Sequence, residues 1–281
     1  MLDAALRGSL LLGGLLVTGA ATCALLFPSE PRNRITALAL LASTWSVIAL
    51  PLRLFRQASA FVDLGEPVAP MLQVIVRQTT WGHGWTIHIA AAFLALIGAV
   101  WWRRSGPALM LVVSAVGMAV GSAMTGHATS GTWSPTIGVT VHAVHALAAG
   151  AWIGTLTVLV VAVFPRTRAA DELLAIVTRF SPVALVSAGV LAVGGATMIW
   201  VVIVGPPRLL DAAWGKLVVA KLVLVGAVVV GGAWNWRRAT PSLAAGGDPK
   251  ALVRGARIEL LIAMLVLAVT AVLVDAAPPA P

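Results

Sequence analysis

Five histidines, the side chains in this sequence best suited to binding a metal ion, lie in three neighbouring segments between residues 83 and 145. His142 and His145 are three residues apart, a spacing that places both imidazoles on one face of a helix, within reach of a common ion. His127 lies in the segment just before them. Together these three residues predict a three-ligand metal site, with His88 and His83 as further candidate ligands.

The type of ligand narrows the choice of metal. Imidazole nitrogens, with few carboxylates and no cysteine nearby, suit copper, zinc or haem iron and disfavour magnesium and calcium, which prefer oxygen. Met124 lies three residues before His127 and adds a thioether sulfur of the kind that binds copper(I). The residues alone therefore leave copper, zinc and haem iron as candidates.

A purely structural interpretation of the same residues stays open. The histidines lie near Trp81, Trp85 and Trp133, and amphipathic side chains of this kind form belts at the two membrane interfaces. Met124 is equally suited to ordinary packing.

The composition of the 281-residue chain is that of a membrane protein. Hydrophobic residues make up 59% of it, charged residues 10%, and its mean hydropathy is +0.97, whereas soluble domains are about 25% charged. The formal charge of +9 comes mostly from arginines in short stretches between apolar runs, which is how a membrane protein records its orientation. We therefore expect lipid around the chain and no nucleic-acid partner.

Eight apolar runs are long enough to cross a bilayer, which takes about 20 helical residues. They cover residues 8–27, 35–55, 84–102, 107–126, 136–164, 180–204, 212–235 and 255–275. Between the second and third runs, residues 56–83 include Pro67 and Pro70 and are predicted to lie along the membrane surface. The sequence thus predicts an all-α polytopic membrane protein, with residues 1–281 forming a single transmembrane domain of eight helices.

Lysine and arginine are unevenly divided between alternate connections, and such an imbalance sets orientation. One set of connections holds eleven of them: Arg32, Arg34, Arg103, Arg104, Arg166, Arg168, Arg179, Arg237, Arg238, Lys250 and Arg254. The other set holds five: Arg7, Arg53, Arg56, Arg77 and Arg208. The first set is predicted to be cytoplasmic, so both termini lie outside and all five histidines fall toward the outer face.

Four polar residues interrupt the last two apolar runs: Lys216, Lys221, Asn235 and Glu259. Lys216 is close enough to the outer face for its ammonium group to reach water. Lys221 lies roughly 13 Å into the span at about 1.5 Å per residue, so it needs a polar partner or water. Glu259 is near the cytoplasmic end, where we expect a structural hydrogen bond to Asn235 or to the arginines that follow it.

Several glycines recur at spacings that let two helices approach closely. These are Gly117 with Gly121, Gly150 with Gly154, Gly194 with Gly195, and Gly231 with Gly232. Tight packing is the expected role of all four pairs. A passage for a ligand is an alternative for the last two.

Two runs of sequence carry a family resemblance. They are Thr125-Gly126-His127-Ala128 and Val141-His142-Ala143-Val144-His145, which continues to Trp152-Ile153-Gly154. In these runs the chain resembles the copper resistance protein D family of bacterial membrane proteins, with its Gly-His-Ala and His-x6-Trp-x-Gly patterns. The similarity continues in Arg179-Phe180-Ser181, in Trp214-Gly215-Lys216 through Lys221 to Asn235, in Glu259, and in Pro278-Pro279. It is strongest over residues 121–281; before them it is limited to helix pattern and Thr80-Trp81-Gly82.

This resemblance implies copper handling at the bacterial cytoplasmic membrane, by uptake or by transfer from a periplasmic copper-binding protein of the CopC type. A cluster of His127, His142 and His145 would receive the ion, and the bundle interior would conduct it inward. The sequence contains no phosphate-binding Gly-x-x-x-x-Gly-Lys motif. Transport is therefore expected to be passive, ion-coupled or driven by a partner protein. The protein is expected not to be an enzyme.

The main alternative is a b-type cytochrome, in which two histidines on facing helices bind haem axially. His88 with His142 or His145 would hold one such haem b near the outer face. The inner half of the predicted bundle contains no histidine, so a second haem has no ligands there.

Overall fold

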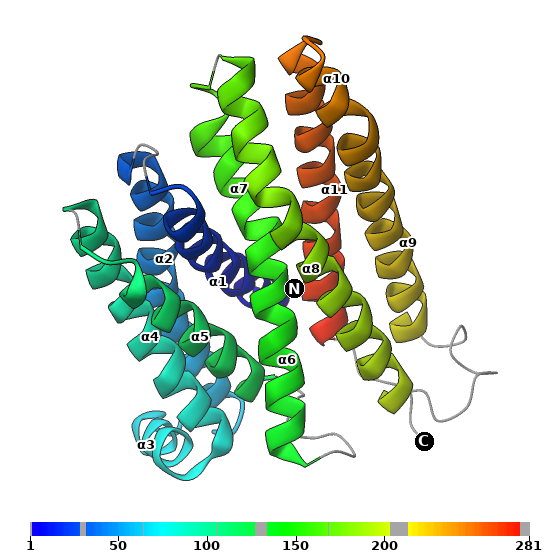
Figure 1. Cartoon of the computed structure of the whole chain (residues 1–281). Helices are drawn as coiled ribbons and strands as arrows, with labels where there is room; N and C mark the ends of the chain where they lie inside the picture. The colour runs from blue at the N-terminus through cyan, green and yellow to red at the C-terminus, as the bar shows by residue number, and fades with distance from the viewer. Residues whose placement is uncertain are drawn as a thin grey trace.

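The computed structural model describes residues 2–28, 32–63, 65–104, 106–126, 134–167, 169–202 and 213–275, and all regular structure in these ranges is helical (Figure 1). The first five helices are α1 (Leu2–Leu26), α2 (Arg32–Ser59), α3 (Ala69–Gln78), α4 (Thr80–Arg103) and α5 (Leu109–Met124). One continuous helix follows, made of α6 (Pro135–Ala149), η2 (Gly150–Gly154), α7 (Thr155–Val158) and η3 (Leu159–Val163). The rest are α8 (Ala170–Val202), α9 (Ala213–Trp234), η5 (Asn235–Ala239), α10 (Thr240–Ala244) and α11 (Pro249–Asp275).

Within the described residues, seven helices are long and apolar enough to cross a membrane. They are α1, α2, α4, the continuous helix from α6 to η3, α8, the continuous helix from α9 to α10, and α11. The remaining predicted span, residues 107–126, corresponds to α5, which has 16 residues. At 1.5 Å per residue such a helix is about 24 Å long, shorter than the roughly 30 Å of a hydrocarbon core. The all-α bundle is confirmed, whereas eight full crossings remain a prediction.

Helix α8 begins ten residues before the predicted span of 180–204. Its first turn carries Asp171 and Glu172, and acidic side chains there stabilise the positive end of the helix dipole. The start of α8 is therefore set by charge near the surface, which hydropathy does not report.

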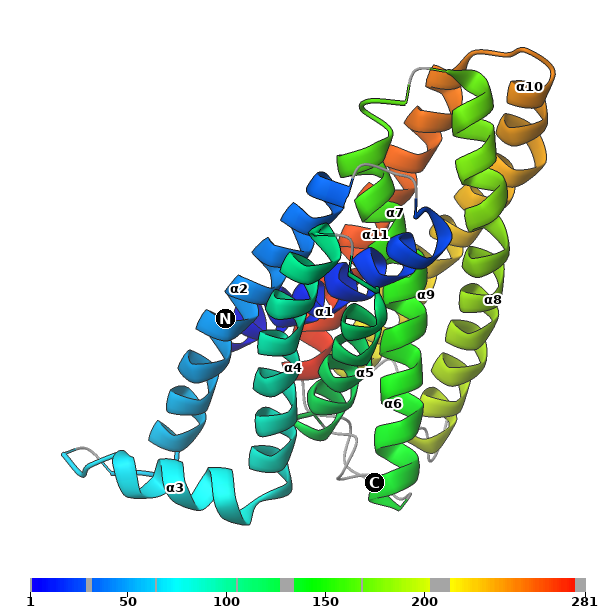
Figure 2. The ribbon, with the colours of Figure 1, turned by 60° about the vertical axis from the view of Figure 1, so that its left-hand side comes forward.

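The segment predicted to lie along the membrane surface contains helix α3, which runs across one end of the bundle between α2 and α4 (Figure 2). Ile75 of α3 packs against Leu54 and Ala58 of α2. This placement supports a surface position for residues 69–78.

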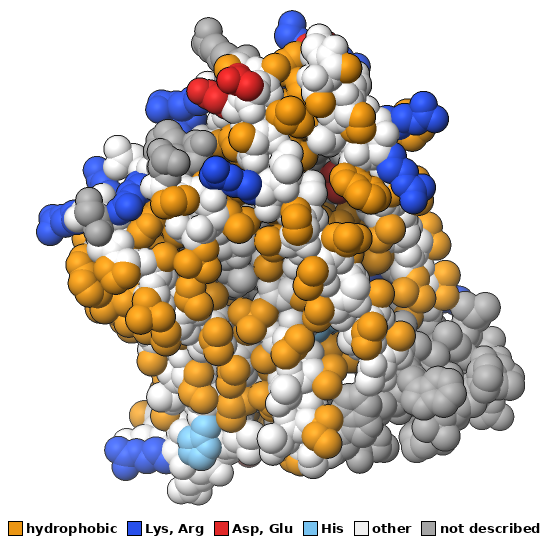
Figure 3. Space-filling view, in the orientation of Figure 1, with side chains coloured by type: hydrophobic (Ala, Val, Ile, Leu, Met, Phe, Trp, Pro, Cys, Tyr) orange, Lys and Arg blue, Asp and Glu red, His pale blue; other side chains and the backbone are white. Residues whose placement is uncertain are grey.

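Charge and apolar surface are separated along the bundle. Figure 3 shows a broad band of hydrophobic side chains, with most of the lysine and arginine visible on this face gathered toward the end at which α10 lies. Large apolar side chains in the band are well exposed, among them Leu41, Leu185 and Val193. Such a surface fits lipid, and the clustering of basic residues agrees with the predicted cytoplasmic end.

Helix α1 crosses the bundle obliquely and contacts α2, α5, η2, α7 and α11. Its closest contact is with η2, where a Cβ at Gly154 would collide with the Leu15 carbonyl and a Cβ at Gly19 with the Gly154 backbone. Gly150 likewise packs on Thr18. The predicted packing role of Gly150 and Gly154 is confirmed.

Candidate metal site

Helix α6 positions two of the predicted ligands. It starts at Pro135, after an N-cap at Ser134 whose hydroxyl accepts a hydrogen bond from the Ile137 amide. His142 Nδ1 lies 2.9 Å from the carbonyl oxygen of Gly138. Because a carbonyl only accepts, Nδ1 carries the proton and the lone pair is on Nε2. Metal-binding histidines usually have this arrangement, in which a backbone carbonyl fixes the ring.

His145, one turn further along α6, faces α8. A Cβ at Gly194 would lie 3.5 Å from His145 Nδ1, and one at Gly195 would lie 3.9 Å from its Cε1. Nδ1 is buried and has no hydrogen-bond partner among the described residues. The ring interacts electrostatically with His142 and with Lys221 of α9. Gly194 and Gly195, for which the sequence predicted helix packing, lie beside the imidazole, and an added Cβ at either position would be in ordinary van der Waals contact with it.

The third predicted ligand, His127, lies outside the described residues. Within the described ranges, no group of three or more His, Cys, Asp or Glu side chains is placed to hold a metal ion. The structure thus brings His142 and His145 together. The three-ligand site stays a prediction.

His88 and Met124 belong to a different interface, the one between α4 and α5. A Cβ at Gly121 would lie 2.7 Å from His88 Cβ, and one at Gly84 would lie 2.5 Å from Met124 Cβ. His88 is 2% exposed, and neither ring nitrogen has a hydrogen-bond partner in the described part of the chain. Buried polar atoms without partners are uncommon and require explanation by water, an ion or a functional role.

The predicted haem site receives no support from this geometry. In Figure 1, α5 lies between α4 and α6, and α6 turns Ala143 toward α5. His145 is on another side of α6, against α8. His88 and His145 therefore do not face a common space. His83, near the start of α4, is exposed.

The sequence interpretation missed a cluster centred on Arg53, where α4 begins and α5 ends, on the side predicted to be outer. Its guanidinium donates to Thr125 Oγ1 at 3.0 Å and to the Thr125 carbonyl at 2.9 Å. It also lies over the Trp81 ring, 5.4 Å from the centroid, and interacts electrostatically with His88. The sequence did contain a signal for this cluster. Arg53 lies at the end of a predicted span, on the side predicted to have fewer basic residues.

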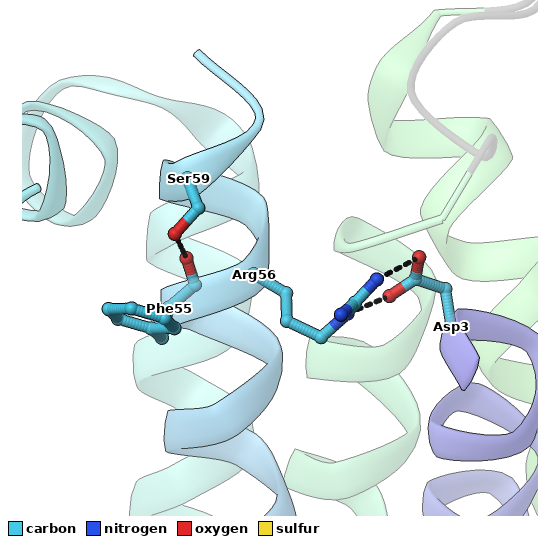
Figure 4. A network of polar contacts seen from close by, with 4 residues as sticks. All are labelled: Asp3, Phe55, Arg56 and Ser59. Atoms are coloured by element: carbon cyan, nitrogen blue, oxygen red, sulfur yellow. Dashed lines mark hydrogen bonds and ion pairs between the residues drawn. The ribbon is translucent and has the colours of Figure 1, made fainter. Parts of the chain in front are cut away.

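Arg56, one turn after Arg53, joins α2 to the start of α1. Its Nε and Nη2 donate to the two carboxylate oxygens of Asp3, at 2.6 and 2.9 Å (Figure 4). Both side chains are more than a third exposed, so this bidentate pair mainly fixes geometry and adds little stability.

The four polar residues of the last two spans lie as follows. Lys216 is exposed and Lys221 is partly buried, which agrees with the expectation that only Lys221 needs a partner within the bundle. Asn235 Nδ2 donates a 2.8 Å hydrogen bond to Glu259 Oε2. This bond between the last two spans is one of those that the sequence predicted.

Two family models match the sequence, and between them they cover most of it. One, described as "Copper resistance protein D-like, N-terminal domain", matches residues 1–136. The other, described as "Copper resistance protein D", matches residues 174–273. The first match reaches the amino-terminal region, where the sequence motifs alone had indicated little similarity. His142 and His145 lie between the two matched regions.

Among curated proteins, the chain is similar to "Inner membrane protein YebZ" of Escherichia coli (strain K12). The two are 30% identical over 193 residues, which is 67% of this chain and 66% of that relative. The similarity thus spans about two thirds of the relative's length. No solved structure matches the chain.

Proposed function

The chain belongs to the copper resistance protein D family and is a multi-pass protein of the cytoplasmic membrane, and from this premise we propose that it moves copper ions across that membrane. The ion enters from the outer side through a histidine site on α6. Copper is the cargo in this proposal, so the protein binds it reversibly.

The paired imidazoles of His142 and His145 are the observation that carries the proposal. They share one face of α6, and the hydrogen bond from His142 Nδ1 to Gly138 directs its other nitrogen outward from the helix backbone. His145 presents a buried nitrogen that has no partner among the described residues. Two imidazoles give a copper ion two ligands of a suitable type. His127 is the proposed third ligand.

The inward path in this proposal begins at the α6·α8 interface. Gly194 and Gly195 lie beside His145, and Lys221 interacts electrostatically with the same ring. A positive charge there would oppose a copper cation, so a fully charged Lys221 would act as a barrier that the ion must pass. On the outer side, a periplasmic copper-binding protein of the CopC type is the proposed donor.

Copper binding by the purified protein tests this proposal. The double variant H142A/H145A should bind less copper per chain and with lower affinity. Each lost ligand should weaken binding by at least about 1.4 kcal/mol, which is about tenfold in affinity. The matched control is T140A, because Thr140 is exposed on the same helix, α6. Unchanged stoichiometry and affinity in the double variant would reject the site.

Two further measurements separate the alternatives. An absorption spectrum of the protein as purified would show a Soret band if haem were bound, and that result would favour the cytochrome alternative. Copper uptake into vesicles containing the wild-type protein tests movement itself. A protein that binds copper but supports no uptake would be a carrier or sensor of copper instead of a transporter.

A further inference from the structure

The α9·α11 interface contains a buried carboxyl group far from the histidine pair. Glu259 of α11 is 7% exposed, and its Oε2 accepts a hydrogen bond from Asn235 Nδ2 at 2.8 Å. Asn235 lies 14 residues after Lys221 on the same continuous helix, about 21 Å along its axis. Glu259 is therefore near the opposite end of the bundle from His145 and Lys221, on the predicted cytoplasmic side.

Three glycines lie against this polar pair, and at two of them, Gly232 and Gly255, an added Cβ would meet it too closely. A Cβ at Gly232 of α9 would lie 2.8 Å from Glu259 Oε1, and one at Gly231 would lie 3.5 Å from its Cγ. A Cβ at Gly255 of α11 would collide with the Asn235 side-chain amide. The sequence predicted that Gly231 and Gly232 bring two helix backbones together. In the structure, the atoms nearest to their Cβ positions belong to the Glu259 side chain. The three glycines form a recess that fits a carboxyl and an amide.

The backbone also presents Asn235 to α11. Asn235 is the first residue of the π-helical turn η5, and its carbonyl oxygen accepts a hydrogen bond from Thr240 Oγ1 at 3.1 Å. Such turns change the direction in which side chains leave a helix and are frequent at functional sites.

In the described part of the chain, no lysine or arginine forms an ion pair with Glu259. On η5, the Arg237 and Arg238 guanidinium groups lie over the rings of Trp236 and Trp234. On α11 itself, Arg254 and Arg257 are exposed. An ionised carboxylate in this apolar interface would therefore lack a countercharge, which is strongly unfavourable.

The other elements in contact with α11 do not supply that charge either. They are α1, α7, η3 and α10, and α7, η3 and α10 contain no ionisable side chain. Helix α1 contributes Asp3 and Arg7 near its start and Cys23 near its end. On α9, Lys216 and Lys221 are both at least 14 residues from Asn235. A proton or another cation must accompany the Glu259 carboxylate.

We propose that Glu259, held by Asn235 in this glycine recess, is a proton-binding site whose proton is released when a copper ion reaches the inner half of the bundle. Since Oε2 accepts from Asn235, the proton is bound at Oε1. On release, the O–H bond breaks, its electron pair stays on the carboxylate, and the proton passes to cytoplasmic water. The copper cation then balances the carboxylate charge, and a proton from cytoplasmic water returns when copper leaves. The coupling rests on the proposed copper transport, but the proton site does not.

Infrared spectroscopy tests the proton site without copper. The carbonyl stretch of a protonated carboxyl group should be present in wild-type protein at neutral pH and shift in heavy water. It should be lost in E259Q and kept in E172Q, because Glu172 is exposed at the start of α8. Absence of the band from the wild type, or its persistence in E259Q, would overturn the assignment. Should E259Q fail to fold, N235A keeps the carboxyl group and should shift the same band; an unmoved band would overturn the assignment.

Copper uptake into vesicles tests the coupling. Because Glu259 gives its proton to cytoplasmic water and takes one back in each cycle, the wild-type rate should fall at low internal pH, where proton release is slow, and at high internal pH, where proton return is slow, and E259Q should lose this dependence. Equal pH dependence in both proteins would overturn the coupling. A wild type that shows the infrared band but moves no copper would refute the proposed transport and leave the proton site standing.

Discussion

Glycine provides the closest helix contacts on both sides of the bundle, but it faces different neighbours at the α1·η2 crossing and at the α9·α11 interface. At the crossing, Gly19 and Gly154 face each other's backbone and the Leu15 carbonyl. At α9·α11, Gly232 and Gly255 face the side chains of Glu259 and Asn235. The same small residue therefore serves backbone contact in one region and polar side chains in the other.

This difference separates a scaffold from a candidate pathway. Around α1, the core cluster is apolar and closely packed, with residues such as Val158 and Leu159 fully buried. The α6·α8 and α9·α11 interfaces instead contain His145 and Glu259. Polar groups inside a membrane are costly and usually mark function, which is why the proposed copper path runs along these later helices.

The α4·α5 interface combines both situations. Gly121 lies against His88 at a spacing that leaves no room for a side chain, and the imidazole is enclosed without a hydrogen-bond partner among the described residues. This arrangement resembles the scaffold in its packing and the pathway in its chemistry.

Substitution at the α1·η2 crossing should have the largest effect. In Gly154→Ala the new methyl group would meet the Leu15 carbonyl, which is backbone and has little freedom to move. We expect the free energy of unfolding to fall by about 3 kcal/mol, the upper end of the cost of overpacking. The measurement is the midpoint of thermal unfolding in detergent, which should be lower than in the wild type. Gly14→Ala is the matched control on α1, because nothing lies within 4 Å of its Cβ position. Equal midpoints for the two variants would contradict the scaffold assignment.

Filling the space beside His145 should have an intermediate effect. Gly194→Leu places a bulky side chain against the imidazole of His145, so copper affinity should fall about tenfold, or 1.4 kcal/mol, with the fold retained. Gly189→Leu, also on α8, has no neighbour within 4 Å of its Cβ position and should bind copper like the wild type. Titration of both proteins with copper is the measurement. Wild-type affinity in Gly194→Leu would remove His145 from the site.

The smallest effect is expected at the glycine recess. In Gly232→Ala the methyl group would lie 2.8 Å from Glu259 Oε1, but the end of that flexible side chain is able to move. We expect a destabilisation of about 1 kcal/mol and a shifted infrared band for the Glu259 carboxyl group. Gly226 is on the same helix, with nothing within 4 Å of its Cβ position. The control variant Gly226→Ala should therefore leave both the stability and the infrared band unchanged. If Gly232→Ala changed neither the stability nor the infrared band, the proposed difference between the α9·α11 interface and the α1·η2 crossing would be contradicted.

Much of the architecture was predictable because it depends on local pattern. Apolar runs of sufficient length gave the spans, and two family-specific motifs gave the copper resistance protein D family. The hydrogen bond between Asn235 and Glu259 was also foreseen, because both residues lie near the same end of adjacent helices. The short length of α5 was not foreseen, because the predicted span of 107–126 counted two residues at each end that lie outside the helix.

The facing of each polar side chain depended on contacts that hydropathy does not encode. From the sequence, His88 and His145 belonged to one outer cluster, since both lie at a similar predicted depth. In the structure the first faces Gly121 and the second faces Gly194. Depth along a span follows from residue count, whereas direction around a helix matters only once its neighbours are known.

The sequence by itself thus determined that the chain is a helical membrane protein, which family it belongs to, and that His142 and His145 share a face, because a helix repeats every 3.6 residues wherever it is placed. Only the tertiary structure decided which helix that face meets, and that glycines on α8 and α9 lie against His145 and Glu259. The physical reason is that such a contact is a property of two surfaces together, and neither surface specifies the other.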